Sequence, residues 1–194
     1  VFGLLDILSG RVLLGERDIT GLPPAEVVAA GVAYVPQVGN VFVSMSVEEN
    51  LEMGAYLRRD DIRPRIEEIY AMFPDLRARR REAAGSLSGG QRQMVAMGKA
   101  LMTEPALLLL DEPTAGLSPR YRGQIFETVR AINASGVPVL MVEQNAKQAL
   151  GIADRAYVLE GGENRHEGTG AALRDDPEVA RMFLGARAAP LSET

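Results

Sequence analysis

The 194-residue chain lacks cysteine altogether and has a single histidine, His166. Without cysteine it can form neither disulfides nor metal sites built on thiolates. His166 falls in a predicted strand, and we do not expect it to be catalytic. No apolar run approaches the length of a membrane-spanning helix, so we expect none of these residues to cross a bilayer.

An excess of basic residues is also missing. The 21 Lys and Arg residues are outnumbered by 26 Asp and Glu, which gives a net charge of −5. Nucleic-acid-binding proteins usually carry a basic face, so we expect no nucleic acid among the partners. The length of the chain and its 46% hydrophobic residues suit one domain with a substantial core, or a domain with a subdomain.

An apolar run from Ala106 to Leu110 ends on two adjacent carboxylates, Asp111 and Glu112. Its four consecutive leucines show no alternation, which predicts a strand buried on both faces, as in a parallel sheet. Open α/β sheets place their ligands at the carboxyl ends of such strands. We therefore expect Asp111 to hold Mg²⁺ and Glu112 to act on an attacking water.

A glycine-rich turn precedes this strand and opens a helical pattern over residues 92–101. Two adjacent glycines let the backbone approach a ligand closely. The first N–H groups of a helix and its positive dipole end attract phosphate. We expect this turn to bind a phosphate group through Leu87, Ser88, Gly89, Gly90 and Gln91.

These two segments, in this order, resemble the signature motif and the Walker B strand of ABC-type ATPases. The resemblance implies an α/β fold, with a P-loop NTPase-like core of mainly parallel sheet and an inserted α-helical subdomain. It implies that residues 1–37 and 104–194 form the core and that residues 38–103 form the helical subdomain carrying the signature motif. The implied cofactors are ATP and Mg²⁺.

Three further positions follow from the resemblance. Gln37, after the strand Val32–Val35, is similar to the Q-loop glutamine, which reaches Mg²⁺ or the attacking water. Gln144, after a second apolar strand at Val137–Val142 that we expect to be buried, stands where the family commonly has a histidine. It should therefore act by hydrogen bonding rather than proton transfer. Ser118 replaces the usual aspartate of the D-loop, and we expect it to cap the next helix.

Several segments resemble more specifically the ATP-binding subunits of branched-chain amino acid importers, the LivF type. That subgroup implies a head-to-tail heterodimer with a second ABC ATPase subunit. It also implies transmembrane permease subunits as partners, and a peripheral position on the cytoplasmic face of the cell membrane. The segments are Asp18–Pro24, Tyr34–Gln37, Ser46–Leu51, Val142–Ala146 and Tyr157–Gly162.

Two other functions remain open at this point. One is a soluble ABC ATPase of DNA repair or translation, although the chain has no sustained heptad run for the coiled coil that repair types need. The other is a non-catalytic partner subunit that completes a neighbour's site. The presence of Glu112 argues against this second alternative.

The motif Gly-x-x-x-x-Gly-Lys-Ser/Thr, the P-loop, does not occur in the 194 residues. We interpret this as an N-terminal truncation, because Val1–Leu8 resembles the end of an amphipathic helix; the alternative is a natural shortened subunit. We therefore expect the chain alone to be inactive. Elsewhere, the pattern predicts a capping box at Ser46 and Glu49 and a loose tail over residues 186–194. It also predicts helices near 25–30, 47–56, 61–73, 121–133, 146–152 and 176–184, and a two-stranded ribbon over 155–167.

Overall fold

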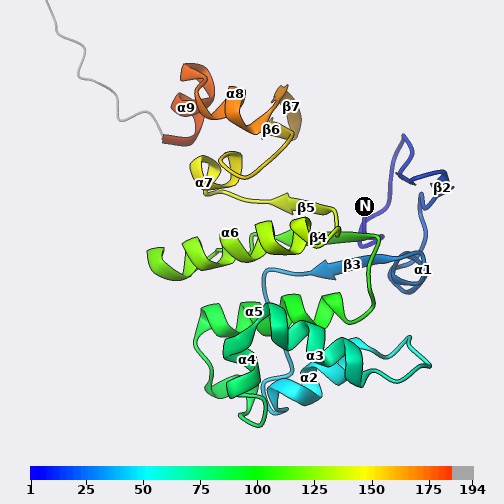
Figure 1. The fold of residues 1–194 in the computed structure, drawn as a ribbon. Helices are drawn as coiled ribbons and strands as arrows, with labels where there is room; N and C mark the ends of the chain where they lie inside the picture. Colours follow the sequence, from blue (N-terminus) through cyan, green and yellow to red (C-terminus); the bar gives the residue numbers. More distant parts are fainter. Residues whose placement is uncertain (185–194) are drawn as a thin grey trace, which may run out of the picture. The chain divides into compact units, whose positions relative to one another are not determined.

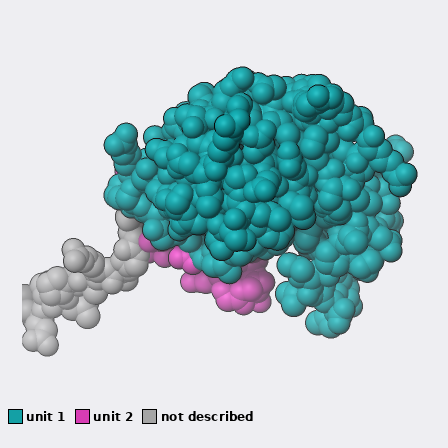
Figure 2. All heavy atoms as spheres, turned by 90° about the horizontal axis from the view of Figure 1, so that it is seen from below, with its two compact units in different colours: residues 1–142 teal, residues 143–194 magenta. Residues whose placement is uncertain are grey.

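The computed structural model describes residues 1–184. The chain divides into two compact units, residues 1–142 and 143–194 (Figure 2). The first unit holds β1 (Leu13–Leu14), β2 (Arg17–Asp18), α1 (Pro24–Ala29), β3 (Val32–Val35), α2 (Val47–Gly54), α3 (Arg63–Met72), α4 (Pro74–Ala78), the 3₁₀ turn η1 (Ala84–Ser86), α5 (Gly89–Leu101), β4 (Leu107–Asp111), α6 (Pro119–Ala134) and β5 (Val139–Val142). The second holds α7 (Ala146–Leu150), β6 (Ala156–Glu160), β7 (Glu163–Gly168), α8 (Gly170–Arg174) and α9 (Pro177–Leu184).

A parallel sheet of order β3-β4-β5 forms the centre of the first unit (Figure 1). In this register Val35 lies opposite Leu110, and Asp111 lies opposite Val142. The three strands, each expected from an apolar run, are neighbours in this sheet. Within β4, the side chains from Leu108 to Leu110 are no more than 7% exposed. The uninterrupted leucine run therefore marks a strand covered on both faces, as expected.

Strand β5 differs from its prediction. The segment Val137–Val142 was expected to be a buried strand, but the strand begins at Val139, and half-buried residues alternate with exposed ones. Leu140 is 48% exposed and Val142 is 59% exposed. The reason is its place in the sheet: among the described residues it is an edge strand, paired only with β4. Apolar composition alone does not distinguish an edge strand from a central one.

Helices α2 to α5 gather into one group, with α5 packed against β3 (Figure 1). Their interior is formed by large side chains that are at most 1% exposed: Leu51, Ile69, Leu76, Met97 and Leu101. The predicted capping box at the start of α2 is present. Ser46 Oγ accepts from the N–H of Glu49, and the Glu49 carboxylate accepts from the N–H of Ser46.

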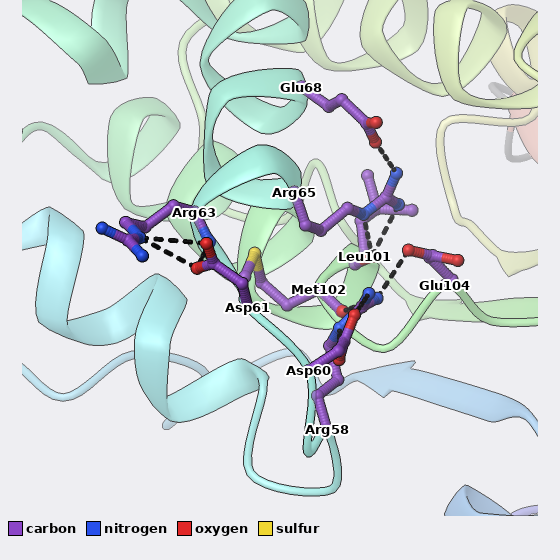
Figure 3. Close-up of polar contacts among 9 residues, drawn as sticks. All are labelled: Arg58, Asp60, Asp61, Arg63, Arg65, Glu68, Leu101, Met102 and Glu104. Atoms are coloured by element: carbon purple, nitrogen blue, oxygen red, sulfur yellow. Dashed lines mark hydrogen bonds and ion pairs between the residues drawn. The ribbon is translucent and has the colours of Figure 1, made fainter.

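Two arginines hold the C-terminal end of α5 (Figure 3). Arg65 Nη2 donates to the carbonyl of Leu101 at 2.7 Å, and Arg58 Nη1 donates to the carbonyl of Met102 at 3.3 Å. Their side chains are only 16% and 17% exposed, respectively. Helix carbonyls in the last turn lack partners within the helix, and cations there also interact favourably with the dipole. This end of α5 is thereby fixed to the segment between α2 and α3 and to α3 itself.

The first eight residues form no helix, contrary to the expectation for Val1–Leu8. Gly3 has a φ of 74°, in the left-handed region that a right-handed helix does not use. Phe2 instead packs its ring on Tyr34 of β3, with 4.7 Å between centroids. The tertiary contact and the glycine thus override the helical pattern.

The second unit contains the predicted ribbon, in which β6 and β7 pair antiparallel. Its core cluster consists of Leu150, Val158, Leu173 and Val179. His166 lies in β7 opposite Val158, as a strand residue. The short helix α8, capped by Thr169, was not predicted. No helix within residues 1–184 is long and apolar enough to span a membrane, and the predicted tail lies outside the described residues.

Candidate functional site

The carboxyl ends of β3 and β4 bring Gln37, Asp111 and Glu112 together. Asp111 is the last residue of β4, and Glu112 follows it. Gln37 lies two residues beyond β3, and its Nε2 donates to Glu112 Oε2 at 2.8 Å. Because neighbouring parallel strands end at the same edge of a sheet, residues 75 positions apart meet here. The arrangement can hold a water or a metal ion beside two carboxylates.

Glu112 has a backbone conformation that is rare for a side-chain-bearing residue, with a φ of 43°. Such a conformation costs on the order of 1–3 kcal/mol and persists only where its surroundings enforce it. Here the N–H of Glu112 donates to the carbonyl of Val142 in β5 at 2.9 Å. The carboxylate is therefore aimed by β5 through the backbone and by Gln37 through the side chain. Nothing in the sequence signals this conformation.

Asp111 is half-buried and accepts a hydrogen bond from the hydroxyl of Tyr34 at 3.0 Å. Burial, together with this bond to Asp111, raises the pKa of Tyr34, so the hydroxyl stays a donor at neutral pH. Sequence reasoning missed Tyr34. Its signal was a tyrosine near the carboxyl end of the strand next to the one that ends in Asp111.

The side chains at this site could supply only part of the ligand shell of Mg²⁺. Within residues 1–184, no group of three or more His, Cys, Asp or Glu side chains is placed to hold a metal ion. Mg²⁺ commonly binds one or two carboxylates and completes its shell with waters and substrate phosphates. Asp111 fits that pattern, because Tyr34 engages Oδ2 and leaves Oδ1 for a metal-bound water.

The predicted phosphate-binding turn has a second capping box. Gln91 Oε1 accepts from the N–H of Ser88 at 2.9 Å, and Ser88 Oγ accepts from the N–H of Gln91 at 3.3 Å. Arg92 Nη1 also donates to the carbonyl of Leu87. A hydroxyl that accepts a bond keeps its own proton for donation. Ser88 can therefore donate to a phosphate oxygen without giving up its role as a cap.

Gly89 and Gly90 occupy the first two positions of α5. The N–H groups at these positions have no carbonyl one turn earlier in the helix, so they suit an anion, as does the dipole at this end. The side-chain and backbone donors of Leu87–Gln91 thus form one locally rigid turn. We find the five residues where the sequence placed them, at the start of the helix.

A half-buried hydrogen bond between two side-chain amides joins α5 to the segment that follows Gln37. Asn40 Nδ2 donates to Gln93 Oε1 at 2.8 Å, and Gln93 is only 7% exposed. Asn50, fully buried in α2, accepts from the N–H of Phe42 and donates to its carbonyl. Sequence reasoning missed these amides; the only signal for Asn50 and Gln93 is a polar residue at an otherwise apolar helix position.

Gln144 belongs to the second unit and is exposed. It lies two residues beyond the end of β5, and its carbonyl accepts from the N–H of Ala146 at 2.8 Å, at the start of α7. Ser118 is the N-cap residue of α6, as expected, but its side chain makes no capping hydrogen bond. Pro119 at the first helical position already has the φ of a helix, so the helix can start without that bond.

Comparison with known proteins is consistent with this geometry. Residues 1–115 match the family model of the ABC transporter. The chain is 44% identical over 178 residues to the high-affinity branched-chain amino acid transport ATP-binding protein BraG of Pseudomonas aeruginosa, spanning 91% of this chain and 76% of that protein. It is 41% identical over 187 residues to the probable branched-chain amino acid transport ATP-binding protein LivF of Archaeoglobus fulgidus, spanning 95% and 79%.

Among solved structures, the ADP conformation of an ATP-binding cassette from an ABC transporter superposes with a TM-score of 0.79 at 29% identity. The match covers 94% of this chain and 80% of that cassette. The fold and the site thus define an ATP-binding cassette with a parallel core sheet. The chain belongs to the ABC transporter family, and it is a nucleotide-binding subunit of the ATPase class.

Proposed function

We propose that this chain is the ATP-hydrolysing subunit of an importer for branched-chain amino acids. The observation that carries the ATPase part is the contact between Gln37 and Glu112 at the ends of β3 and β4. The transported solute rests on the names of the two relatives, both of which are branched-chain amino acid transport proteins. None of the residues at the site has a chemistry that recognises an aliphatic amino acid.

In this proposal, ATP is held between two cassettes arranged head to tail, this chain and a second ABC subunit. Asp111 would hold Mg²⁺, which would neutralise phosphate charge, and Glu112 would orient and deprotonate the attacking water, with Gln37 beside it. Ser88, Gly89 and Gly90 bind the γ-phosphate of the ATP seated on the other cassette. Catalysis is then mostly positioning and charge stabilisation, as in other phosphoryl transfers.

The role of Gln144 in this proposal is to position the reacting groups by hydrogen bonds. A glutamine side chain can donate and accept at once but does not titrate near neutrality. We also propose that residues 1–37 and 104–194 act as the core, and residues 38–103 as a helical subdomain. Support for that division comes from the group of helices α2 to α5, which packs around its own apolar interior.

The membrane subunit would sit on the segment between Gln37 and Leu57, at the cytoplasmic face of the membrane. This segment exposes six large apolar side chains, and exposed apolar patches mark interaction sites. Lys99 Nζ lies 4.8 Å from the ring centroid of one of them, Phe42. The six are Val38 at 78%, Phe42 at 44%, Val43 at 60%, Met53 at 44%, Tyr56 at 63% and Leu57 at 45% exposed.

The test is reconstitution with the candidate membrane subunits and second ATPase subunit, with ATP turnover followed as leucine, isoleucine or valine is supplied. Stimulation by these amino acids, and not by acidic or basic ones, is the expected result. Val43→Asp should weaken association with the membrane subunits. Leu13→Asp is the matched control, because Leu13 is also 53% exposed but lies in β1. Equal effects of both substitutions would argue against the proposed seat.

A further inference from the structure

Gly90 lies in the signature turn and is packed against α6. It is buried, and a Cβ placed on it would lie 2.7 Å from Cγ of Tyr121 and closer still to Cδ1. Real Cβ atoms essentially never come within 3.0 Å of another residue's atoms. Beside it, a Cβ on Gly89 would lie 3.1 Å from Cδ2 of Leu117. Leu117 and Tyr121, which both follow Glu112 in the sequence, thus pack directly against Gly89 and Gly90.

Backbone conformation does not explain why glycine occupies position 90. Gly90 is the second residue of α5 and is not among the described glycines with positive φ. In the middle of a helix glycine is destabilising relative to alanine by about 0.5–1 kcal/mol, and a helical backbone at the first turn gives glycine no advantage over alanine. Helix propensity therefore does not favour glycine at this position. The ring of Tyr121 supplies the reason, because only glycine leaves room for it.

We propose that Tyr121 is a positioning residue for the phosphate-binding turn, and that Gly90 is glycine in order to accept its ring. The ring fixes the first turn of α5 against α6, and so places Ser88 Oγ and the N–H groups of Gly89 and Gly90. Helix α6, which carries Tyr121, is also close in sequence to Glu112, because only six residues separate Glu112 from its start. The segment from Glu112 to Tyr121 therefore carries the catalytic carboxylate at one end and, at the other, the ring that holds the turn Leu87–Gln91.

This proposal rests on the proposed ATPase function but predicts a stability effect that is independent of it. The 194-residue chain is unfolded in urea as the parent sequence, as Gly90→Ala, as Tyr121→Ala and as the double variant. With Tyr121 present, Gly90→Ala lowers the urea midpoint, because the new methyl group collides with the ring. With Tyr121→Ala, the same substitution leaves the midpoint unchanged or raises it, because alanine favours the helix.

The functional arm uses the reconstituted ATPase. Tyr121→Ala is expected to lower kcat at least tenfold with a smaller change in KM, because the turn contacts the γ-phosphate only when the two cassettes close. Tyr121→Phe keeps the ring and is expected to restore turnover. Gly89→Ala serves as the matched control for the stability cycle, because its neighbour Leu117 Cδ2 is the mobile end of a flexible side chain.

Two results would overturn the proposal. One is a Gly90→Ala substitution that destabilises equally with and without the Tyr121 ring. The other is a Tyr121→Ala variant that loses stability but keeps its kcat. If Gly90→Ala alone does not fold, its recovery on adding Tyr121→Ala is the positive result. If the parent complex shows no ATP hydrolysis at all, the proposed function fails. The urea midpoints of the four variants still test whether Tyr121 packs on Gly90.

Discussion

Replacing Glu112 by glutamine tests the proposed chemistry most directly. The amide has the same shape as the carboxylate but cannot take a proton from the attacking water. General-base groups typically contribute about 10²–10⁴-fold to a rate, which corresponds to about 2.7–5.4 kcal/mol of barrier at 1.36 kcal/mol per tenfold. We therefore expect Glu112→Gln to slow ATP turnover at least about 100-fold. The turnover rate is measured as phosphate release by the assembled ATPase, in a version of the chain that includes a phosphate-binding loop.

The structure predicts that the fold and the binding of ATP survive this substitution. Gln37 Nε2, now 2.8 Å from Glu112 Oε2, can donate to the new amide oxygen instead. A neutral hydrogen bond is roughly half as strong as a charge-assisted one, so the contact weakens without being lost. Glutamine and glutamate are equally strained at a φ of 43°. Equilibrium ATP affinity should therefore change little.

Glu104 provides a matched control for this experiment. It is the other non-glycine residue with a positive φ among the described residues, at 50°, and it lies beyond the C-terminal end of α5. Glu104→Gln removes a carboxylate from the same kind of backbone but should leave turnover unchanged. Near-normal turnover of Glu112→Gln would refute Glu112 as the base. So would a loss of ATP affinity large enough to account for the whole loss of rate.

Three further predictions concern other parts of the chain. Gln144→Ala should lower turnover without removing any titration near neutrality from the pH profile, whereas Gln144→His should add one; no effect of either would reduce Gln144 to a loop residue. Tyr70→Phe should keep or raise stability, because the buried Tyr70 hydroxyl has no hydrogen-bond partner among residues 1–184. Burial, and to a lesser extent Glu48, raises the pKa of Tyr70 from 10 to about 12. The unfolded chain therefore loses this proton first, and stability in urea should fall between pH 10 and about 12 in the parent but less in the variant. Finally, the 194-residue chain alone should show no steady ATP turnover and no micromolar Mg²⁺-ATP affinity, because it contains no Gly-x-x-x-x-Gly-Lys-Ser/Thr and its two adjacent carboxylates repel a triphosphate.

Local sequence signals predicted the local features of this site. The capping box at Ser46 depends on residues three positions apart and was predicted. The one at Ser88 and Gln91 has the same spacing but was not predicted. The meeting of Gln37 with Glu112 was also predictable, because each follows an apolar strand and parallel strands end together. These features follow from rules that involve one element or one pair of strands.

Features that depend on packing between elements were not predictable in the same way. The ring of Tyr121 in α6 packs on Gly90 in α5, and strand β4 lies between these two helices in the sequence. The hydroxyl of Tyr34 reaches Asp111 only in the register that pairs Val35 with Leu110. Neither residue type signals its contact. The exposure of β5 likewise depends on how many strands flank it, which its apolar sequence does not reveal.

The backbone strain at Glu112 gives the edge strand β5 a direct influence on the Glu112 carboxylate. The carbonyl that holds the N–H of Glu112 belongs to Val142, the last residue of β5. Among the described residues, that strand pairs on one side only, and the Val142 side chain is 59% exposed. Edge strands open more readily than central ones, since fewer hydrogen bonds and contacts hold them. Any strand that paired with the other side of β5 would therefore stiffen the backbone of Glu112 without touching its side chain.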